Sequence, residues 1–190
     1  MKEPSRCSLL YAHEVPHDDD GNPLGDTLFS SAIRAYEALP EATKQRLIGL
    51  NAVHSYMHIF DIISAKKRVG AANLVPLTEE QRKKVPEVVH PVVITHPFTR
   101  KKILFVNEGI TVRIADLPQD EGDSLLKTLV DHAHKPDFIY RHRWRVGDLL
   151  MWDNFSTQHL AMHDYELPRR RRMHRTTVQG STPVYDPLPN

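Results

Sequence analysis

The sequence predicts a mainly β fold with flanking helices, built as a single domain over residues 1–190. Short apolar or β-branched runs recur between turn-forming residues, as expected for strands, at residues 8–12, 91–95, 102–106, 149–152 and 170–178. The 14 prolines also favour short strands and turns. The runs at 91–95 and 102–106 are separated by the polar segment HPFTRK, which is typical of a hairpin. A chain of 190 residues is long enough to bury a core.

Composition excludes several classes of protein. The net charge of +1 at pH 7 gives no overall field that would attract nucleic acid or a membrane surface. The single cysteine, Cys7, excludes an internal disulfide framework and is typical of a reducing compartment. No signal peptide or long apolar segment is visible, so we expect a soluble, cytoplasmic protein.

Two helices are expected in the first third of the chain. Residues 30–39 have helical spacing, and Asp26 or Thr27 is the candidate N-cap. Residues 41–50 form the second helix, and residues 51–56 return to strand character.

A third helix and an irregular segment are expected later. Residues 124–134 carry apolar side chains on one stripe, with Asp123 as candidate N-cap, so this helix would brace the outside of a sheet. Residues 62–86 lack a clean period and contain three consecutive basic residues. This segment is therefore a candidate for a mobile insertion.

The stretch from residue 144 to residue 180 contains the strongest chemical signal. Its second strand, residues 170–178, alternates, and one face would carry Arg171, Met173, Arg175 and Thr177. If that face points inward, a pocket receives two guanidinium groups roughly 13 Å apart, at about 3.3 Å per residue. Such a pocket suits two anions, or one anion at each end. His159, just before the strand, is a candidate metal ligand beside them.

The residues alone leave other interpretations open. The four arginines at 169–172 are also typical of a solvated basic turn or a nucleic-acid patch. However, the run leads directly into an alternating strand and contains no lysine, and arginine is the better residue for holding a carboxylate through two hydrogen bonds. A lone histidine among twelve is also typical of a structural or exposed position.

The C-terminal part of the chain reads WDNFSTQH, followed by DY, LP, RR, MHR and TTVQG. This series of motifs resembles the C-terminal motif of the taurine dioxygenase (TauD/TfdA-like) family, whose members are Fe(II)- and 2-oxoglutarate-dependent oxygenases and include phenoxyacetate herbicide dioxygenases. Upstream, the resemblance continues in SLLYAHEVP, GDTLFSSAIRAYEAL and HPVVITHPFTRKKILFVNEG, so it spans nearly all of the chain. It implies a double-stranded β-helix (jelly-roll, cupin-like) fold, with residues 62–86 in the position of the family's lid.

The resemblance also implies a role for individual residues. His159 is matched to a ligand of the iron, and Thr27 and Arg171 to the residues that hold the far carboxylate of 2-oxoglutarate. Arg175 is matched to the arginine that holds an anionic group of the substrate. The other substrate-binding positions are Tyr56, Ile110 and Trp152. Two alternatives stay open. The loop before the arginines is one residue longer than expected, so Arg170 could take the place of Arg171. Tyr56 also suits a core or edge position.

The remaining metal ligands are the difficulty. The family's iron is held by two histidines and one carboxylate, and its His-x-Asp pair lies upstream of the SLLYA motif. Since Ser8 follows Met1 by only seven residues, we expect the pair to be missing, the fold to be incomplete at its N-terminus, and the chain to be a C-terminal portion that is inactive by itself. The segment at 17–19, HDD, is formally His-x-Asp but lies in a loop where the family has no ligands.

Three hypotheses follow. The first is a dioxygenase that uses O2 to hydroxylate a small organic anion (a sulfonate, sulfate ester or carboxylate) and releases succinate and CO2. Ile110 and Phe155 depart from a strict taurine enzyme, so a bulkier anion is an alternative. The second is a catalytically dead anion-binding or interaction module of the same fold. The third, a nucleic-acid-binding protein, is disfavoured by the inward alternation of the arginines. We therefore expect no nucleic-acid and no membrane partner, and leave a homo-oligomer open.

Overall fold

A computed structural model describes residues 2–65 and 78–187. The strands are β1 (Cys7–Glu14), β2 (Thr27–Ser31), β3 (Asn51–His54), β4 (Val88–Pro91), β5 (Val93–Thr95), β6 (Lys102–Leu104), β7 (Thr111–Ile114), β8 (Ile139–His142), β9 (Leu149–Asp153), β10 (Thr157–Ala161) and β11 (Arg172–Val178). The helices are α1 (Ala32–Glu37), α2 (Glu41–Leu47), α3 (Tyr56–Ala65), α4 (Glu79–Lys83), α5 (Gln119–Ala133) and a 3-10 turn at Pro136–Phe138. The prediction of a mainly β chain with flanking helices is confirmed.

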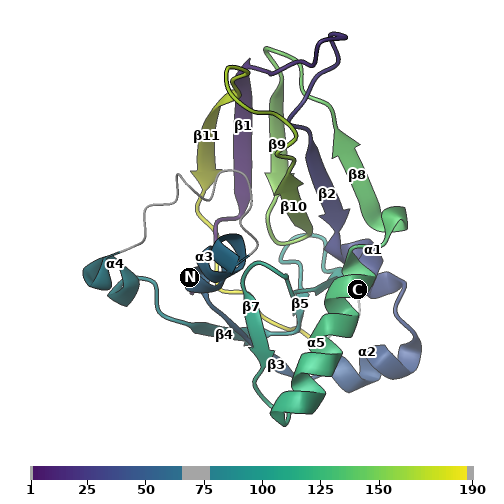
Figure 1. Cartoon of the computed structure of the whole chain (residues 1–190). Coiled ribbons are helices and arrows are strands. Elements are labelled where there is room, and N and C mark those ends of the chain that lie inside the picture. Colours follow the sequence, from purple (N-terminus) through teal and green to yellow (C-terminus); the bar gives the residue numbers. More distant parts are fainter. Residues whose placement is uncertain (1, 66–77, 188–190) are drawn as a thin grey trace.

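Two antiparallel three-stranded sheets occupy the upper half of the molecule (Figure 1). One sheet has the order β11-β1-β9, and the other has the order β10-β2-β8. They meet through aromatic side chains, because the ring centroids of Phe29 on β2 and Trp152 on β9 lie 5.3 Å apart. The two faces of β1 differ in burial, so that Ser8 and Ala12 are buried while Tyr11 and His13 on the other face are exposed.

The lower half combines the sheet β4-β3-β7 and the hairpin β5-β6 with helices α1, α2 and α5 (Figure 1). The β-branched run at 92–94 is wholly buried, as expected for strands covered on both faces. Helix α5 packs on β7 and buries its apolar stripe, which includes Leu125 and Leu129. The predicted hairpin is present, with Val93 opposite Leu104, and the predicted helix does brace a sheet.

Both predicted helix caps are wrong. Thr27 lies inside β2, which pairs with β10 on one side and β8 on the other, so tertiary pairing overrides the local capping signal. The N-cap of α1 is Ser31, whose hydroxyl accepts a hydrogen bond from Arg34 N at 3.3 Å. Helix α5 begins one turn earlier than predicted, directly after Pro118, so Asp123 is not its cap. No helix within residues 2–65 or 78–187 combines the length and apolar character that a membrane crossing needs.

The segment at 62–86 is helical at both of its described ends. Strand β3 stops at His54, and Tyr56, which was predicted to close that strand, instead begins α3. Helix α4 starts with a capping box in which Thr78 and Gln81 exchange side-chain and backbone hydrogen bonds. Residues 66–77 lie outside the described residues, and the lid role of 62–86 stays a prediction.

Candidate active site

The inward faces of the two upper sheets bring together side chains from five strands. Trp152 on β9 is central, because its ring centroid lies 5.3 Å from that of Phe29 on β2 and 5.0 Å from that of His159 on β10. Arg175 on β11 places its guanidinium carbon 6.0 Å from the Trp152 ring centroid and donates a hydrogen bond from Nη2 to Ser8 Oγ on β1 at 3.0 Å. The Arg175 guanidinium and the His159 imidazole therefore both lie against the Trp152 ring.

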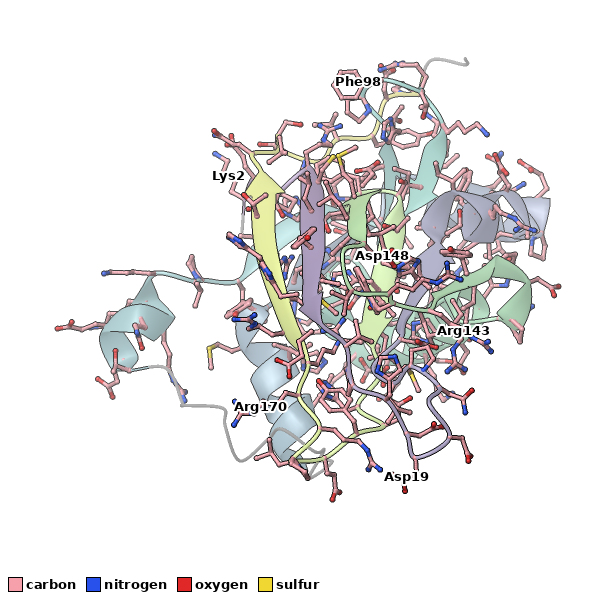
Figure 2. The ribbon with its side chains drawn as sticks, turned by 90° about the horizontal axis from the view of Figure 1, so that it is seen from above. Lys2, Asp19, Phe98, Arg143, Asp148 and Arg170 are labelled. Carbon is pink, nitrogen blue, oxygen red and sulfur yellow. The ribbon has the colours of Figure 1, made fainter. Side chains whose placement is uncertain are left out.

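A second cation enters the same space nearer the loops. Arg171 Nε donates to the Gly25 carbonyl oxygen at 3.1 Å, and the guanidinium carbon lies 5.7 Å from the ring centroid of Trp144. Trp144 is wholly buried and donates from Nε1 to Thr27 Oγ1 at 3.0 Å, so Arg171 and Thr27 share one indole. Arg170, by contrast, is exposed on the outside of the loop before β11 (Figure 2).

The Arg171 guanidinium has an unused hydrogen-bond donor. Within the part of the chain that the structure describes, Nη2 is buried and has no acceptor. Burial lowers the pKa of Arg171, since removal from water disfavours the charged form. A buried cation with a free N–H is costly unless an anion completes its hydrogen bonds. This end of the cavity is therefore suited to a carboxylate.

The turn before β2 fixes the position of Arg171. Gly25 has φ +74° and its N–H donates to Asp164 Oδ1 at 2.7 Å. A Cβ on Gly25 would lie 2.8 Å from Arg171 Cδ, so the arginine passes where a side chain would stand. The next residue, Asp26, is buried and accepts from Arg141 Nε at 2.6 Å, which ties the turn to β8. In the Gly-Asp-Thr motif, Gly25 thus lets Arg171 approach closely, Asp26 anchors the turn to β8, and Thr27 supplies a hydroxyl group.

We expect Gly25→Ala to weaken anion binding, because the added methyl group must displace Arg171. The positive φ also costs about 1–2 kcal/mol of folding free energy for a residue with a Cβ. Gly21→Ala is the matched control, since Gly21 has φ +83° but nothing within 4 Å of an added Cβ. Both variants should lose stability in chemical denaturation, and only Gly25→Ala should lose affinity for 2-oxoglutarate in calorimetry. Equal affinities in the two variants would show that Arg171 is not positioned by this turn.

His159 is held as a neutral imidazole. Burial, and then the positive charge of Arg175, lower the pKa of His159 below its ordinary value. Its ring stacks at 6.2 Å on Phe29, yet part of it stays open to solvent. A neutral ring with an accessible edge is the form in which histidine binds metal ions.

The described residues do not complete a metal site. No three side chains of the His, Cys, Asp and Glu type converge anywhere in residues 2–65 and 78–187. The formal His-x-Asp at 17–19 is engaged within its own loop, because Asp18 accepts from Asn22 Nδ2 at 2.9 Å and Asp19 accepts from Arg169 Nη2 at 2.5 Å. One histidine does not fit a mononuclear iron centre, which needs two further ligands.

Tyr56 and Ile110 lie side by side. Ser55 N donates to the Ile110 carbonyl oxygen at 2.8 Å, so the start of α3 and the loop before β7 are joined, and both side chains are partly exposed. The same loop reaches β10, because Asn107 Nδ2 donates to Gln158 Oε1 at 3.4 Å, next to the candidate histidine. The loop that carries Ile110 is thus linked to β10 one residue before His159.

Several residues of the site were missed in the sequence. They are Ser8, Gly25, Phe29, Trp144 and Asp164. Gly25 and Asp164 were visible as parts of the Gly-Asp-Thr and Asp-Tyr motifs, whereas Trp144 sits in a loop and carries no local signal. Phe155, which departs from a strict taurine enzyme, is buried beneath the Arg6 guanidinium, whose carbon lies 4.4 Å from the ring centroid, and packs against Phe105, so it is a core residue.

The comparison with known families decides the identity of the fold. Residues 1–177 match the family model described as taurine catabolism dioxygenase TauD, TfdA family. The chain belongs to the TauD/TfdA family. It is 37% identical over 176 residues to the alpha-ketoglutarate-dependent 2,4-dichlorophenoxyacetate dioxygenase of Burkholderia sp. (strain RASC), covering 93% of this chain and 54% of that protein. It is 32% identical over 165 residues to an alpha-ketoglutarate-dependent sulfonate dioxygenase of Saccharomyces cerevisiae, and the match covers 85% of this chain and 37% of that protein.

Solved structures share this fold. A crystal structure of AAD-2 in complex with Mn(II) and N-oxalylglycine superposes with a TM-score of 0.77 at 34% identity, over 97% of this chain and 67% of that chain. A taurine dioxygenase from Burkholderia xenovorans superposes with a TM-score of 0.77 at 28% identity, over 97% of this chain and 55% of that chain. The chain spans about half the length of the curated relatives it matches.

Proposed function

We propose that the whole protein is an Fe(II)- and 2-oxoglutarate-dependent dioxygenase that hydroxylates a small organic anion with O2 and releases succinate and CO2. The observation that carries the proposal is the half-buried Arg171, whose buried Nη2 has no acceptor among the described residues and which shares the Trp144 indole with the hydroxyl of Thr27. Family membership and the names of the relatives support the same reaction class.

In this proposal Arg171 and Thr27 hold the far carboxylate of 2-oxoglutarate. Thr27 Oγ1 already accepts a hydrogen bond from Trp144, so its own O–H is free to donate to a carboxylate. Arg171 adds the charge and at least one free N–H. Since Trp144 contacts both residues, one rigid indole fixes the spacing of the two donors.

Iron is the part that the described residues do not fit. They provide His159 as one neutral imidazole, and we propose that the other two ligands lie outside residues 2–65 and 78–187. The bound metal would supply the redox chemistry of the reaction. The described residues supply binding: they orient the dicarboxylate, surround it with Trp144 and Trp152, and place a second cation beside it.

The substrate proposal rests on Arg175. Its Nη2 donates to Ser8 Oγ while the residue is exposed overall, so its other donors are open to a sulfonate, sulfate ester or carboxylate. Tyr56, Ile110 and Trp152 provide an apolar neighbourhood for the body of such an anion. The relatives named for 2,4-dichlorophenoxyacetate, sulfonates and alkyl sulfates all act on organic anions.

Removal of the Arg175 charge should affect the substrate and spare the cosubstrate. We expect Arg175→Ala to weaken binding of an alkyl sulfonate such as hexanesulfonate by roughly 10- to 100-fold, the value of a hydrogen bond to a charged group, with little change for 2-oxoglutarate. Arg172→Ala is the control, because Arg172 lies on the opposite face of β11 and is exposed. Calorimetry measures the affinity of each variant for hexanesulfonate and for 2-oxoglutarate. An equal loss of affinity for both ligands in Arg175→Ala would contradict this division of roles.

A catalytically dead anion-binding module is the second candidate, and it is favoured by the absence of a metal-binding cluster among residues 2–65 and 78–187. The 190-residue chain, supplied with Fe(II), O2 and 2-oxoglutarate, distinguishes the two. Binding of 2-oxoglutarate without succinate formation supports the module for this chain. Succinate formation above the level without protein, abolished in His159→Ala, shows that the dioxygenase is complete. Absence of 2-oxoglutarate binding removes both candidates.

A nucleic-acid partner is not part of this proposal. Of the consecutive arginines, Arg169 is paired with Asp19, and Arg171 is turned toward Gly25 and Trp144. The run therefore does not present a continuous row of free cations, which binding to phosphates requires. We propose that the protein acts in the cytoplasm on a small anionic substrate.

A further inference from the structure

A cavity lies between the end strands of the two upper sheets. Its volume is about 410 Å³, within the usual range for small-molecule sites. The strands concerned are β8 and β9, each the last strand of its sheet. The main side chains around it are Phe29, Arg34, Phe138, Tyr140, Met151 and Trp152. Thr27, His159, Arg171 and Arg175 are not among the lining residues, so this cavity borders the candidate active site and shares its aromatic wall of Phe29 and Trp152.

The walls of the cavity are aromatic. Phe29 and Trp152 meet edge to face, with ring centroids 5.3 Å apart and planes at 60°. Tyr140 is the direct cross-strand neighbour of Phe29 in the pairing of β2 with β8, so their side chains share a face. Phe138 ends the 3-10 turn directly before β8. Flat rings in these orientations favour a planar aromatic ligand over a flexible aliphatic one.

One cation stands at the rim of this cavity. The side chain of Arg34 is exposed, and among residues 2–65 and 78–187 it has no ion-pair partner. Asp153 also lines the space, but its charge is taken up elsewhere: Oδ2 accepts from His96 Nε2 at 2.7 Å and from Ser156 Oγ at 2.8 Å. Its Oδ1 accepts from Phe155 N at 3.0 Å. The available charge at the rim is therefore positive.

The shared wall holds an unused donor. Trp152 is only 8% exposed, and its Nε1 is buried without an acceptor in the described part of the chain. Buried indole N–H groups are normally hydrogen-bonded. A ligand with an acceptor atom next to this ring would satisfy the group, which an aliphatic or aromatic hydrocarbon would not.

We propose that the cavity between β8 and β9 binds an aromatic monocarboxylate, with its ring against Phe29, Tyr140 and Trp152 and its carboxylate on Arg34. The aromatic lining selects the ring, and the unpaired guanidinium selects the anion. This binding site is separate from the proposed 2-oxoglutarate site and does not depend on the proposed reaction.

The two tryptophans make the proposal testable with benzoate as probe. Trp144 and Trp152 are the only tryptophans in the chain, so Trp144→Phe leaves Trp152 as the single fluorescent reporter of this cavity. Benzoate should change its emission with a saturable dependence on concentration. Addition of Arg34→Gln should weaken the apparent affinity at least 10-fold, whereas Arg171→Gln and the exposed control Arg113→Gln should leave it unchanged. Benzamide, which is neutral and of nearly the same shape, should bind at least 10-fold more weakly than benzoate.

The same probe can be followed without altering either tryptophan. With 4-fluorobenzoate and the wild-type chain, fluorine NMR should show a bound fraction that excess 2-oxoglutarate does not displace. Displacement by 2-oxoglutarate, or loss of affinity in Arg171→Gln equal to that in Arg34→Gln, would place the probe in the candidate active site and overturn the proposal. Absence of saturable binding in both measurements, or equal affinity for benzamide, would also overturn it.

Discussion

Replacing Arg171 by alanine should weaken the binding of 2-oxoglutarate by roughly 30-fold or more, since loss of one partner of a buried, hydrogen-bonded charge pair costs about 2–5 kcal/mol. The side chain is half-buried against Trp144, and its Nη2 has no acceptor among the described residues. Removing it leaves the far carboxylate with the Thr27 hydroxyl alone. Calorimetry with 2-oxoglutarate measures the loss directly.

The same variant has a second readout in thermal unfolding. Because burial already lowers the pKa of Arg171, the unliganded chain gains little from this cation, and Arg171→Ala should leave its midpoint nearly unchanged. Saturating 2-oxoglutarate should raise the midpoint of the wild type and not that of the variant. Arg170→Ala is the control, since Arg170 is exposed on the same loop and should behave as wild type. A loss in Arg170→Ala equal to that in Arg171→Ala would reverse the assignment between the two arginines.

The strands that carry this site could be predicted because their patterns are local. The alternation from residue 171 to residue 177 requires only an extended backbone. In the structure Met173 joins a small core with Ala12 and Trp144, and Arg175 reaches Ser8, so both project from the inner face of β11. The hairpin of β5 and β6 was equally readable from two β-branched runs and the polar segment between them.

The partners of those side chains could not be predicted, because they come from distant parts of the chain. Trp144 meets Thr27 across 117 positions, and Arg171 meets Gly25 across 146. Neither contact leaves a periodic signal, and only the sheet order β11-β1-β9 beside β10-β2-β8 brings them together. The predicted cap at Thr27 was wrong for the same reason. Thr27 has a good local capping position, but it lies in a strand that is paired on both sides.

A buried histidine outside the site was also invisible in the sequence. His54 on β3 is 5% exposed, and its ring centroid lies 5.5 Å from that of His90 on β4. Its Nδ1 is 3.1 Å from Thr111 Oγ1, and its Nε2 has no partner among the described residues. Burial, and then the charge of His90, lower the pKa of His54 to about 4. The imidazole is therefore neutral in the folded chain at neutral pH.

This shift predicts that the chain loses stability as the pH falls from about 6.5 to about 4. Between these values the unfolded chain binds a proton at His54 and the folded chain does not, so protonation favours unfolding. The stability is fully present above pH 6.5, and the loss amounts to roughly 3 kcal/mol at 1.36 kcal/mol per pKa unit. Below pH 4 both states are protonated, and this contribution stays constant.

The variant His54→Asn isolates the contribution of this one residue. Asparagine can still bond to Thr111 from the position of Nδ1, but it does not titrate, so the free energy of unfolding should fall less steeply with decreasing pH than in the wild type. Urea denaturation at pH 7, 6 and 5 measures the difference in a range where most carboxylates stay ionised. His13→Asn, on the exposed face of β1, should keep the wild-type slope. If His54→Asn keeps that slope as well, the acid sensitivity arises elsewhere, and the neutral packing of His54 against His90 does not limit stability.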